Sequence, residues 1–381
     1  MRILQLSKFY PPVMGGIESV VFELTEGLNG LHQQTDVLCA NLGMKSVTEQ
    51  WEKGYLVTRA AALGQLLSTS MAPAMIQQLA QRSRRYDVIH VHLPDPMANL
   101  ALWLARPKAK IVLHWHSDII QQKAALAAYE PLQRWLLERA DAIVATSQPY
   151  AQASPWLARY AAKVRAIPIG IQDQGARVDA REVAALRERF GNRRIVFALG
   201  RMVYYKGFDH LIDAARATPD DAVIVIGGSG PLLERLRANV AAQGLTDKVF
   251  LPGRISGEEI ATYFAAAELF CLPSDSRAEA FGVVLLEAMR AGKPIVASDI
   301  PGSGVPWVNV DGTTGLNVPV ADSSALGAAI CRMLDECEFA RQCGLRGRQR
   351  YLEHFTAEKM VDACLRLYAE LTAAPATGAA T

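Results

Sequence analysis

Short apolar runs alternate with amphipathic stretches along the whole of this 381-residue chain. Runs at residues 3–6, 88–91 and 195–199 are separated by stretches with helical spacing, such as residues 17–28. Apolar runs of this length are typical of strands buried on both faces, because crossover helices cover each face of a parallel sheet. The alternation therefore predicts an α/β fold built on parallel sheets.

The pattern occurs twice, which predicts two domains. In the first half we expect strands at residues 3–6, 35–39, 88–91, 111–114 and 142–146, and in the second at 195–199, 222–226, 249–251, 269–272, 294–297 and 315–318. A chain of this length is expected to form more than one core. We expect a Rossmann-like domain at residues 1–170, a linker at 171–190, a second Rossmann-like domain at 191–355 and a final helix at 356–371.

Charge and cysteine content narrow the class of protein. The net charge of +2 does not indicate a nucleic-acid partner, although residues 1–165 carry 17 basic against 12 acidic side chains. This basic excess fits either an anionic membrane surface or an ordinary solvated face. The six cysteines are scattered, as expected for thiols in a reducing compartment. The chain enters a predicted strand at once and lacks a long apolar run, so we expect neither signal peptide nor membrane span.

Two carboxylates, Glu279 and Glu287, lie eight residues apart around a predicted loop-to-helix junction. They flank Phe281, Gly282 and Val283, whose backbone N–H groups would be free at the start of the helix. A helix N-terminus favours anions, while carboxylates bind neutral hydroxyls. The pattern fits a ligand with phosphate in its middle and sugar hydroxyls at both ends, such as a nucleotide-sugar. An amphipathic helix with two solvated acids is the simpler alternative.

A basic loop follows the predicted strand at residues 195–199. It presents Arg201 and Lys206 between Gly200 and Gly207, at the carboxyl end of the strand, where open α/β sheets bind ligands. Two cations in this position suit a diphosphate. Because both side chains are expected on a loop, we expect their removal to leave no cavity in the core.

The basic loop followed by the acidic loop-helix resembles the retaining glycosyltransferases of family 4. The resemblance implies the GT-B fold, in which two Rossmann-like domains with parallel sheets face each other across a deep cleft. It also implies catalytic roles: Arg201 and Lys206 would stabilise the departing diphosphate, and Glu279 would orient the transferred sugar. Glu287 would bind the ribose hydroxyls, and Phe281, Gly282 and Val283 would contact the donor.

Further glycines and a basic residue are implied as donor contacts. The resemblance assigns Gly15 and Gly16 to the donor phosphate and Gly230 to a turn that lets backbone approach the donor. It assigns Arg254 and Ile255 to the segment that meets the nucleobase. A tight turn at residues 15–16 and a solvated Arg254 remain open as alternatives. A dinucleotide fingerprint at residues 227–233 is disfavoured because Leu233 occupies the place of the third glycine.

Four histidines occur in two His-x-His pairs, His90 with His92 and His114 with His116. At strand spacing each pair shares a face, so a metal site is conceivable, with Asp118 as a further ligand. Buried histidines with ordinary hydrogen bonds are the alternative. The family resemblance instead makes His116 a catalytic contact to the transferred sugar.

The segment after His116 completes the expected site. The resemblance makes Asp118 and Lys123 acceptor-binding residues. The sequence has no convincing Asp-x-Asp motif of the kind that binds a nucleotide through a metal ion. We therefore expect no metal and no cofactor besides the nucleotide-sugar co-substrate.

The segment His116-Ser-Asp118 resembles that of bacterial O-antigen and exopolysaccharide mannosyltransferases. The resemblance implies an α-mannosyltransferase that moves a hexose from GDP-mannose onto a polyprenyl-diphosphate-linked saccharide during bacterial O-antigen synthesis. The resemblance implies a cytoplasmic enzyme, peripheral on the inner membrane. A UDP-sugar donor is the nearest alternative. An epimerase of the same fold and a non-catalytic binding protein are the others, and release of free nucleoside diphosphate separates transfer from epimerisation.

Overall fold

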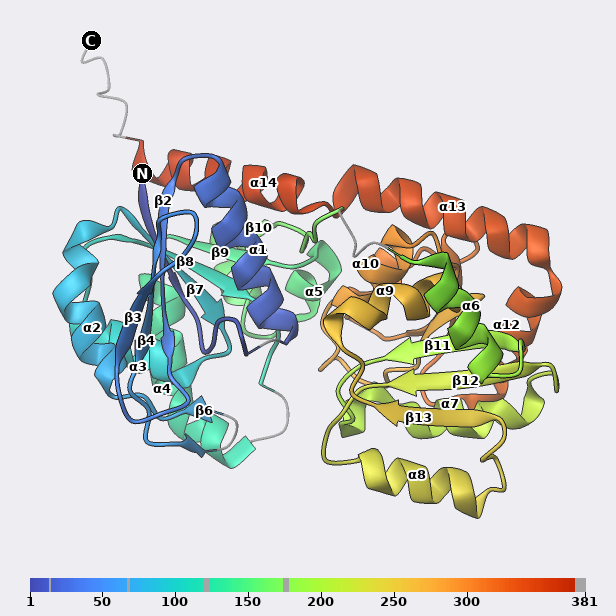
Figure 1. Ribbon diagram of the computed structural model, residues 1–381. Helices are drawn as coiled ribbons and strands as arrows, with labels where there is room; N and C mark the ends of the chain where they lie inside the picture. The colour runs from blue at the N-terminus through green and yellow to red at the C-terminus, as the bar shows by residue number, and fades with distance from the viewer. Residues whose placement is uncertain (14, 67–68, 120–122, 174–177, 374–381) are drawn as a thin grey trace, which may run out of the picture. The chain divides into compact units, whose positions relative to one another are not determined.

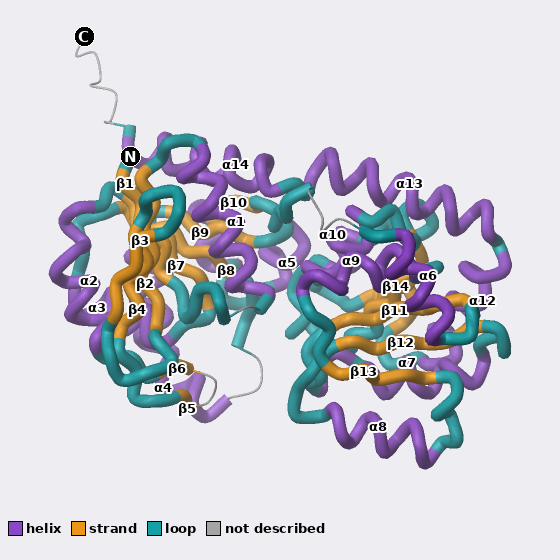
Figure 2. The backbone as a smooth tube through the Cα atoms, viewed as in Figure 1, coloured by secondary structure: helices purple, strands orange, loops and turns teal. Residues whose placement is uncertain are grey.

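The computed structural model describes residues 1–13, 15–66, 69–119, 123–173 and 178–373 (Figure 1). The chain forms two compact units. Met1–Ile171 and Ala357–Thr381 belong to the first, and Gln172–Thr356 form the second. In both units the strands lie side by side in one main sheet with helices on its faces (Figure 2).

The first unit is built on an eight-stranded sheet in the order β10-β9-β8-β7-β1-β2-β4-β3. Its neighbouring strands are parallel except β3, which runs antiparallel to β4. The elements are β1 (Arg2–Leu6), α1 (Gly16–Gly30), β2 (Gln34–Ala40), β3 (Val47–Gln50), β4 (Leu56–Ala60), β5 (Gln65–Leu66), β6 (Thr69–Ser70), α2 (Ala74–Arg82), η1 (Ser83–Arg85), β7 (Val88–Leu93), α3 (Pro96–Ala105), β8 (Lys110–Trp115), α4 (Lys123–Arg139), β9 (Ala142–Ala145), α5 (Gln148–Ala153), η2 (Ala158–Lys163), β10 (Val164–Ala166) and α14 (Ala357–Thr372).

The second unit is built on a six-stranded, wholly parallel sheet in the order β13-β12-β11-β14-β15-β16. Its elements are α6 (Ala180–Arg189), β11 (Arg194–Leu199), η3 (Tyr204–Lys206), α7 (Phe208–Ala214), η4 (Ala215–Ala217), β12 (Ala222–Gly227), α8 (Leu233–Ala242), β13 (Val249–Gly253), α9 (Gly257–Ala266), β14 (Leu269–Leu272), α10 (Val283–Arg290), β15 (Ile295–Asp299), α11 (Val305–Val308), β16 (Gly315–Pro319), α12 (Ser323–Asp335) and α13 (Cys337–His354). The two parallel sheets confirm the predicted α/β architecture.

The core of the second unit follows the alternation of its strands. On β11, Val196 and Ala198 belong to a buried cluster that includes Leu211 of α7 and Leu236 of α8. Phe197 lies between them in sequence, and its ring packs 5.2 Å from that of Phe264 on α9. Successive side chains of a strand point to opposite faces, so β11 is buried on both faces.

Strands β3 and β4 form a hairpin that the apolar pattern did not predict. Every residue of β3 is exposed, whereas β4 is mostly buried. An exposed strand at a sheet edge has no buried face and therefore carries no apolar alternation. The charged and polar side chains of β3 also suit an edge, because they discourage pairing with another chain.

The predicted final helix and the predicted linker each pack within one of the two units. The final helix, α14, packs against α1 of the first unit, and the Ala357 N–H donates a 2.8 Å hydrogen bond to the Ile171 carbonyl. The expected linker at residues 171–190 includes α6, which packs against α9 inside the second unit. Residues 174–177 lie outside the described part of the chain.

Gly207 holds a turn that other residues cannot adopt without strain. It has a φ of +63°, and a Cβ atom there would lie 2.0 Å from the Pro273 carbonyl oxygen. We expect Gly207→Ala to lower the free energy of unfolding by about 3 kcal/mol, since it combines a clash with left-handed strain.

Gly244→Ala is the matched control for this substitution. Gly244 has a φ of +69° but nothing within 4 Å of its Cβ position, so only the strain of about 1 kcal/mol remains. Urea unfolding of both variants measures the difference. Equal losses would show that the approach of Pro273 does not restrain residue 207.

Candidate active site

Strand order places one ligand-binding edge in the second unit. The chain runs from β11 through β12 to β13 on one side, then returns to β14 on the other side of β11. In open α/β sheets ligands bind outside the carboxyl ends of the strands where the order reverses in this way. The loops that follow β11 and β14 lie at this point. They are joined by a 3.0 Å hydrogen bond from the Asp275 N–H to the Tyr205 carbonyl.

A buried ion pair connects these two loops. Lys206 Nζ lies 2.6 Å from Glu279 Oε2, and each side chain is only 10% exposed. The same carboxylate oxygen accepts a 2.9 Å hydrogen bond from Ser274 Oγ. Burial by itself lowers the pKa of Lys206, but Glu279, Tyr205 and Glu287 together raise it, so the amine is charged. The two predicted catalytic residues are thus brought into direct contact.

Arg201 and Lys206 have different environments, although both follow β11. Arg201 is exposed, and no ion pair or hydrogen bond of its side chain is found among the described residues. Lys206 is buried, and its side chain lies across Gly200. The expectation that both residues are freely removable therefore fails for Lys206, because its loss would leave Glu279 buried without a cation.

The N-terminus of α10 offers free backbone donors beside this pair. Gly282 precedes the helix with a φ of +78°, and the N–H groups of Phe281, Gly282 and Val283 have no acceptor among the described residues. The Phe281 ring itself packs 6.1 Å from the Phe355 ring. Only the backbone of Phe281 is therefore available to a ligand, and a helix N-terminus of this kind attracts anions.

Glu287 lies one turn along α10. Its Oε2 atom is buried and has no hydrogen-bond partner in the part of the chain that the structure describes. Burial raises the pKa of Glu287 to about 7, while the charges of Arg290 and Lys206 act to lower it. A buried, unpartnered carboxylate oxygen is costly unless a ligand supplies the missing donor.

The glycine loop after β12 packs on the basic loop. A Cβ at Gly228 would lie 1.8 Å from the Gly200 carbonyl oxygen, and one at Gly230 would lie 2.6 Å from the Met202 carbonyl oxygen. Backbone contact within the protein is sufficient to require both glycines, and a donor contact for Gly230 stays a prediction. Ile255 is buried against Gly227, whereas Arg254 is exposed, so only Arg254 presents its side chain to solvent.

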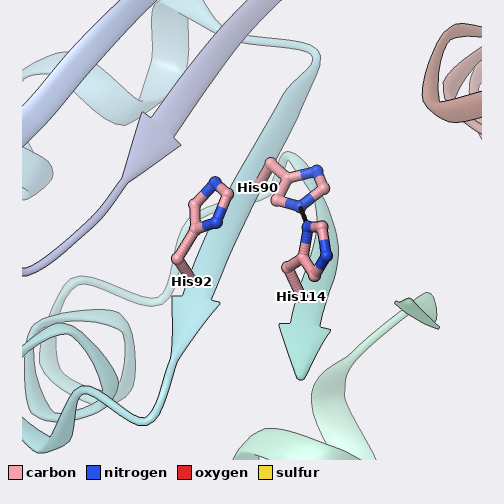
Figure 3. Close-up of side chains that lie close together, drawn as sticks. All are labelled: His90, His92 and His114. Carbon is pink, nitrogen blue, oxygen red and sulfur yellow. Dashed lines mark hydrogen bonds between the residues drawn. The ribbon is translucent and has the colours of Figure 1, made fainter. Parts of the chain in front are cut away.

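A layer of polar side chains covers one face of the sheet in the first unit. Gln5, His90, His92 and His114 are each at most 1% exposed. The register places Gln5 beside His90 and His92 beside His114, so all four point to the same face. Figure 3 shows the three rings, with a hydrogen bond of 3.2 Å between His90 Nε2 and His114 Nδ1. Tyr368 of α14 closes the layer, with Oη 2.5 Å from His90 Nδ1.

The histidine layer has the spacing of a possible metal site. Nitrogen atoms of His90, His92 and His114 lie within 4.8 Å of one another. However, the His90–His114 hydrogen bond occupies one nitrogen of each ring, and Tyr368 Oη contacts the other nitrogen of His90. The rings of His92 and His114 are also stacked, 25° apart, whereas metal ligands direct their in-plane lone pairs to one point. The observed arrangement therefore fits a hydrogen-bonded layer better than a metal centre.

His116 extends this layer beyond the end of β8. It is 6% exposed, and its Nε2 lies 2.9 Å from His92 Nδ1. Its ring stacks on that of His114 at 4.2 Å and 10°. Burial lowers the pKa of His116 well below its ordinary value, with His114 and His90 adding to the effect. The ring is consequently neutral and firmly held.

Asp118 forms hydrogen bonds that hold the loop that carries His116. Its Oδ1 accepts hydrogen bonds of 2.8 Å from both Trp115 Nε1 and Ser154 Oγ. The contacts that the structure provides are thus structural, and the acceptor-binding role stays a prediction. Lys123 is the first residue of α4, but its side chain lies outside the described part of the chain.

The loop after β7, the strand next to β8, contains a carboxylate that the sequence patterns missed. Asp95, 2% exposed, caps α3 by accepting from the Met97 and Ala98 N–H groups. Burial raises its pKa to about 6, although these backbone bonds lower it. Its Oδ2 atom is buried without a hydrogen-bond partner among the described residues. An Asp-Pro sequence is typical of the start of a helix, but it does not indicate that one carboxylate oxygen is left unbonded.

Gly15 and Gly16 begin α1 at the same edge of the first sheet. A Cβ at Gly15 would lie 2.6 Å from Glu18 Oε2, whereas one at Gly16 would meet nothing within 4 Å. Burial raises the pKa of Glu18, against the opposing effects of its own backbone N–H and Lys8. A carboxylate in the first turn competes with a phosphate for the same N–H groups, so the donor role of these glycines stays a prediction.

Two glycosyltransferase family models together match most of the chain. The family model described as Glycosyltransferase Family 4 matches residues 14–174, and that described as Glycosyl transferases group 1 matches residues 182–350. The sucrose-phosphate synthase structure from Thermosynechococcus elongatus superposes with a TM-score of 0.84 at 25% identity, covering 98% of this chain and 100% of the other.

Individual relatives align over nearly their full length. The O-antigen chain mannosyltransferase C of Escherichia coli is 34% identical, over 97% of this chain and 99% of its own. The D-rhamnosyltransferase WbpZ of Pseudomonas aeruginosa is 35% identical, over 94% and 93%. A GDP-mannose-dependent phosphatidylinositol monomannoside mannosyltransferase of Mycolicibacterium smegmatis is 27% identical, over 93% and 94%. With this extent of similarity, the chain belongs to the family 4 glycosyltransferases of the GT-B fold.

Proposed function

We propose that this glycosyltransferase moves mannose from GDP-mannose, with retention of the anomeric configuration, onto a lipid-linked saccharide during O-antigen synthesis. The buried Lys206–Glu279 pair at the reversal of strand order is the observation that carries the proposal. It places a cation and a carboxylate together where a diphosphate joined to a sugar would present complementary groups.

The charges of the second unit suit the departure of a nucleoside diphosphate. Cleavage of the anomeric C–O bond leaves positive charge on the sugar and new negative charge on the phosphate. Lys206, Arg201 and the free N–H groups before α10 would stabilise the phosphate from fixed positions, without reorganisation of solvent. Glu279 would accept hydrogen bonds from sugar hydroxyls, and the unpartnered Glu287 oxygen would accept one from the ribose.

The choice of mannose rests on the relatives. An O-antigen mannosyltransferase and a GDP-mannose-dependent enzyme both align over at least nine-tenths of this chain. A D-rhamnosyltransferase aligns equally well, and D-rhamnose is mannose without its 6-hydroxyl. Transfer of D-rhamnose is therefore the second candidate. Each GDP-sugar, and UDP-sugars as the alternative donors, would be assayed separately. The donor that releases nucleoside diphosphate fastest in the presence of acceptor is the substrate.

The acceptor and location are proposed from the same relatives. We infer a polyprenyl-diphosphate-linked saccharide acceptor, held by the first unit at the cytoplasmic face of the inner membrane, where the basic side chains of that unit would meet anionic lipid. None of the described helices has the length and apolarity of a membrane span. Flotation of the protein with vesicles that contain anionic lipid tests this peripheral association.

The diphosphate site predicts large losses of turnover. We expect Arg201→Ala and Lys206→Gln each to lower turnover at least about a hundredfold, since one preorganised donor is worth about 3 kcal/mol in the barrier. Arg216→Ala, which removes another exposed arginine of the same unit, should leave turnover unchanged. Thermal unfolding should distinguish the two variants, because only Lys206→Gln should destabilise the fold. Normal turnover of both variants at saturating donor would contradict the site.

The raised pKa of Glu287 predicts a pH-dependent contribution to nucleotide binding. Above pH 7 the carboxylate is ionised and accepts strongly from a ribose hydroxyl. Below pH 7 it is increasingly protonated and accepts less well. Calorimetric titration with GDP should therefore show Glu287→Gln weaker than the wild type by about 1.5–3 kcal/mol at pH 8, with a smaller difference at pH 6. A difference that does not change with pH would assign Glu287 to another role.

The proposed mechanism predicts activity without a metal ion. We expect full turnover in excess chelator, because Arg201 and Lys206 supply the positive charge beside the phosphate. We expect His116→Ala to lower turnover while leaving GDP affinity unchanged, because the nucleotide is held by the second unit. Elemental analysis and a chelator titration check this prediction. Stoichiometric metal together with chelator-sensitive turnover would refute it.

A further inference from the structure

His92 forms hydrogen bonds through both ring nitrogens, deep inside the first unit. Its Nε2 lies 2.9 Å from Gln5 Oε1, and its Nδ1 lies 2.9 Å from His116 Nε2. Burial lowers the pKa of His92 well below its ordinary value, and the neighbouring histidines add to the effect. A neutral imidazole has one N–H donor and one acceptor nitrogen, so the two bonds of His92 must run in the same sense along the chain of residues.

Gln5 determines the direction in which these hydrogen bonds are donated. Its Oε1 can only accept, so His92 must carry its proton on Nε2 and accept through Nδ1. His116 must then donate through Nε2, and its Nδ1 is left with a lone pair. The amide places Oε1 toward the His92 ring, and Gln5 Nε2 is buried without a hydrogen-bond partner among the described residues.

The ring of His116 is fixed in orientation as well as in tautomer. The planes of His92 and His116 differ by only 14°. The face of His114 stacks on His116 at 4.2 Å and prevents its rotation. Nδ1 of His116 has no partner among the described residues, yet it is not among the side-chain atoms sealed from solvent. This nitrogen is therefore available to a ligand.

We propose that Gln5 and His92 are positioning residues that hold the proton of His116 on Nε2, so that Nδ1 accepts a hydrogen bond from a hydroxyl of the transferred hexose. The inference rests on the proposed function, in which His116 contacts that sugar. The opposite tautomer would present an N–H group at Nδ1. That N–H group could donate to a hydroxyl oxygen, but it could not accept a hydrogen bond from the hydroxyl.

The tautomer can be measured directly in the free, full-length protein. Nitrogen-15 labelling of the seven histidines and long-range proton–nitrogen correlation spectra distinguish protonated from unprotonated ring nitrogens. The spectrum of His116→Gln assigns the resonances of residue 116. We expect His116 Nε2 to be protonated and Nδ1 to be unprotonated in the wild type. A proton on Nδ1 would overturn the proposal, whatever the variants do.

Gln5→Met tests the relay, because it removes the acceptor at similar side-chain size. We expect the His116 resonances to move toward averaged positions, as both tautomers become populated. Turnover should fall about tenfold, the value of one net hydrogen bond, with GDP affinity unchanged. Thr25→Val is the stability control: it removes a buried hydroxyl of α1 that donates to the Val21 carbonyl. It should alter neither the resonances nor turnover.

The outcomes separate the inference from the proposed function. An unchanged His116 tautomer in Gln5→Met would refute the positioning role of Gln5 and His92. A changed tautomer with unchanged turnover would establish that role, but it would show that His116 Nδ1 does not act in transfer. A parallel loss of turnover in Thr25→Val would show that general destabilisation causes the effect, and would also count against the relay.

Discussion

The reversal of strand order in a parallel sheet is the constraint on which the candidate site depends. Parallel strands bring all their carboxyl ends to one edge, and the return of the chain from β13 to β14 separates the loops that follow β11 and β14. Without that separation, helices would cover the edge. Because the loops lie on either side of the reversal, residues more than seventy positions apart in sequence meet there, as Lys206 and Glu279 do.

Both units also keep polar groups in their interiors, and each does so by a different means. In the second unit a charge is balanced by an opposite charge, and removal of one partner is costly. In the first unit neutral imidazoles bond to one another and to Gln5, so that this layer of side chains carries no charge. Nine side-chain oxygen or nitrogen atoms are nevertheless buried without a hydrogen-bond partner among the described residues, including Glu287 Oε2, Asp95 Oδ2, His114 Nε2 and Gln5 Nε2.

The sequence was sufficient to predict the strands that are buried on both faces, because such strands need continuous apolar runs. It was insufficient for β3, whose exposed position leaves no periodic signal. Among site residues, the order of Arg201, Lys206, Glu279 and Glu287 was visible as a motif. The burial of Lys206, the bracing role of Asp118 and the lone oxygen of Asp95 were not visible, because each depends on neighbours from distant segments. Gln5 is an example of the same limit: in sequence it is one polar residue inside an apolar strand.

The discontinuity of the first unit has a consequence for synthesis on the ribosome. Its final helix, α14, is made only after the whole of the second unit, yet Tyr368 of that helix provides the bond that closes the histidine layer at His90. The second unit is contiguous in sequence, and its strands and helices are complete once residue 356 has emerged. The half of the protein that is translated first therefore finishes folding last, and until then its row of imidazoles lacks the phenol that covers it.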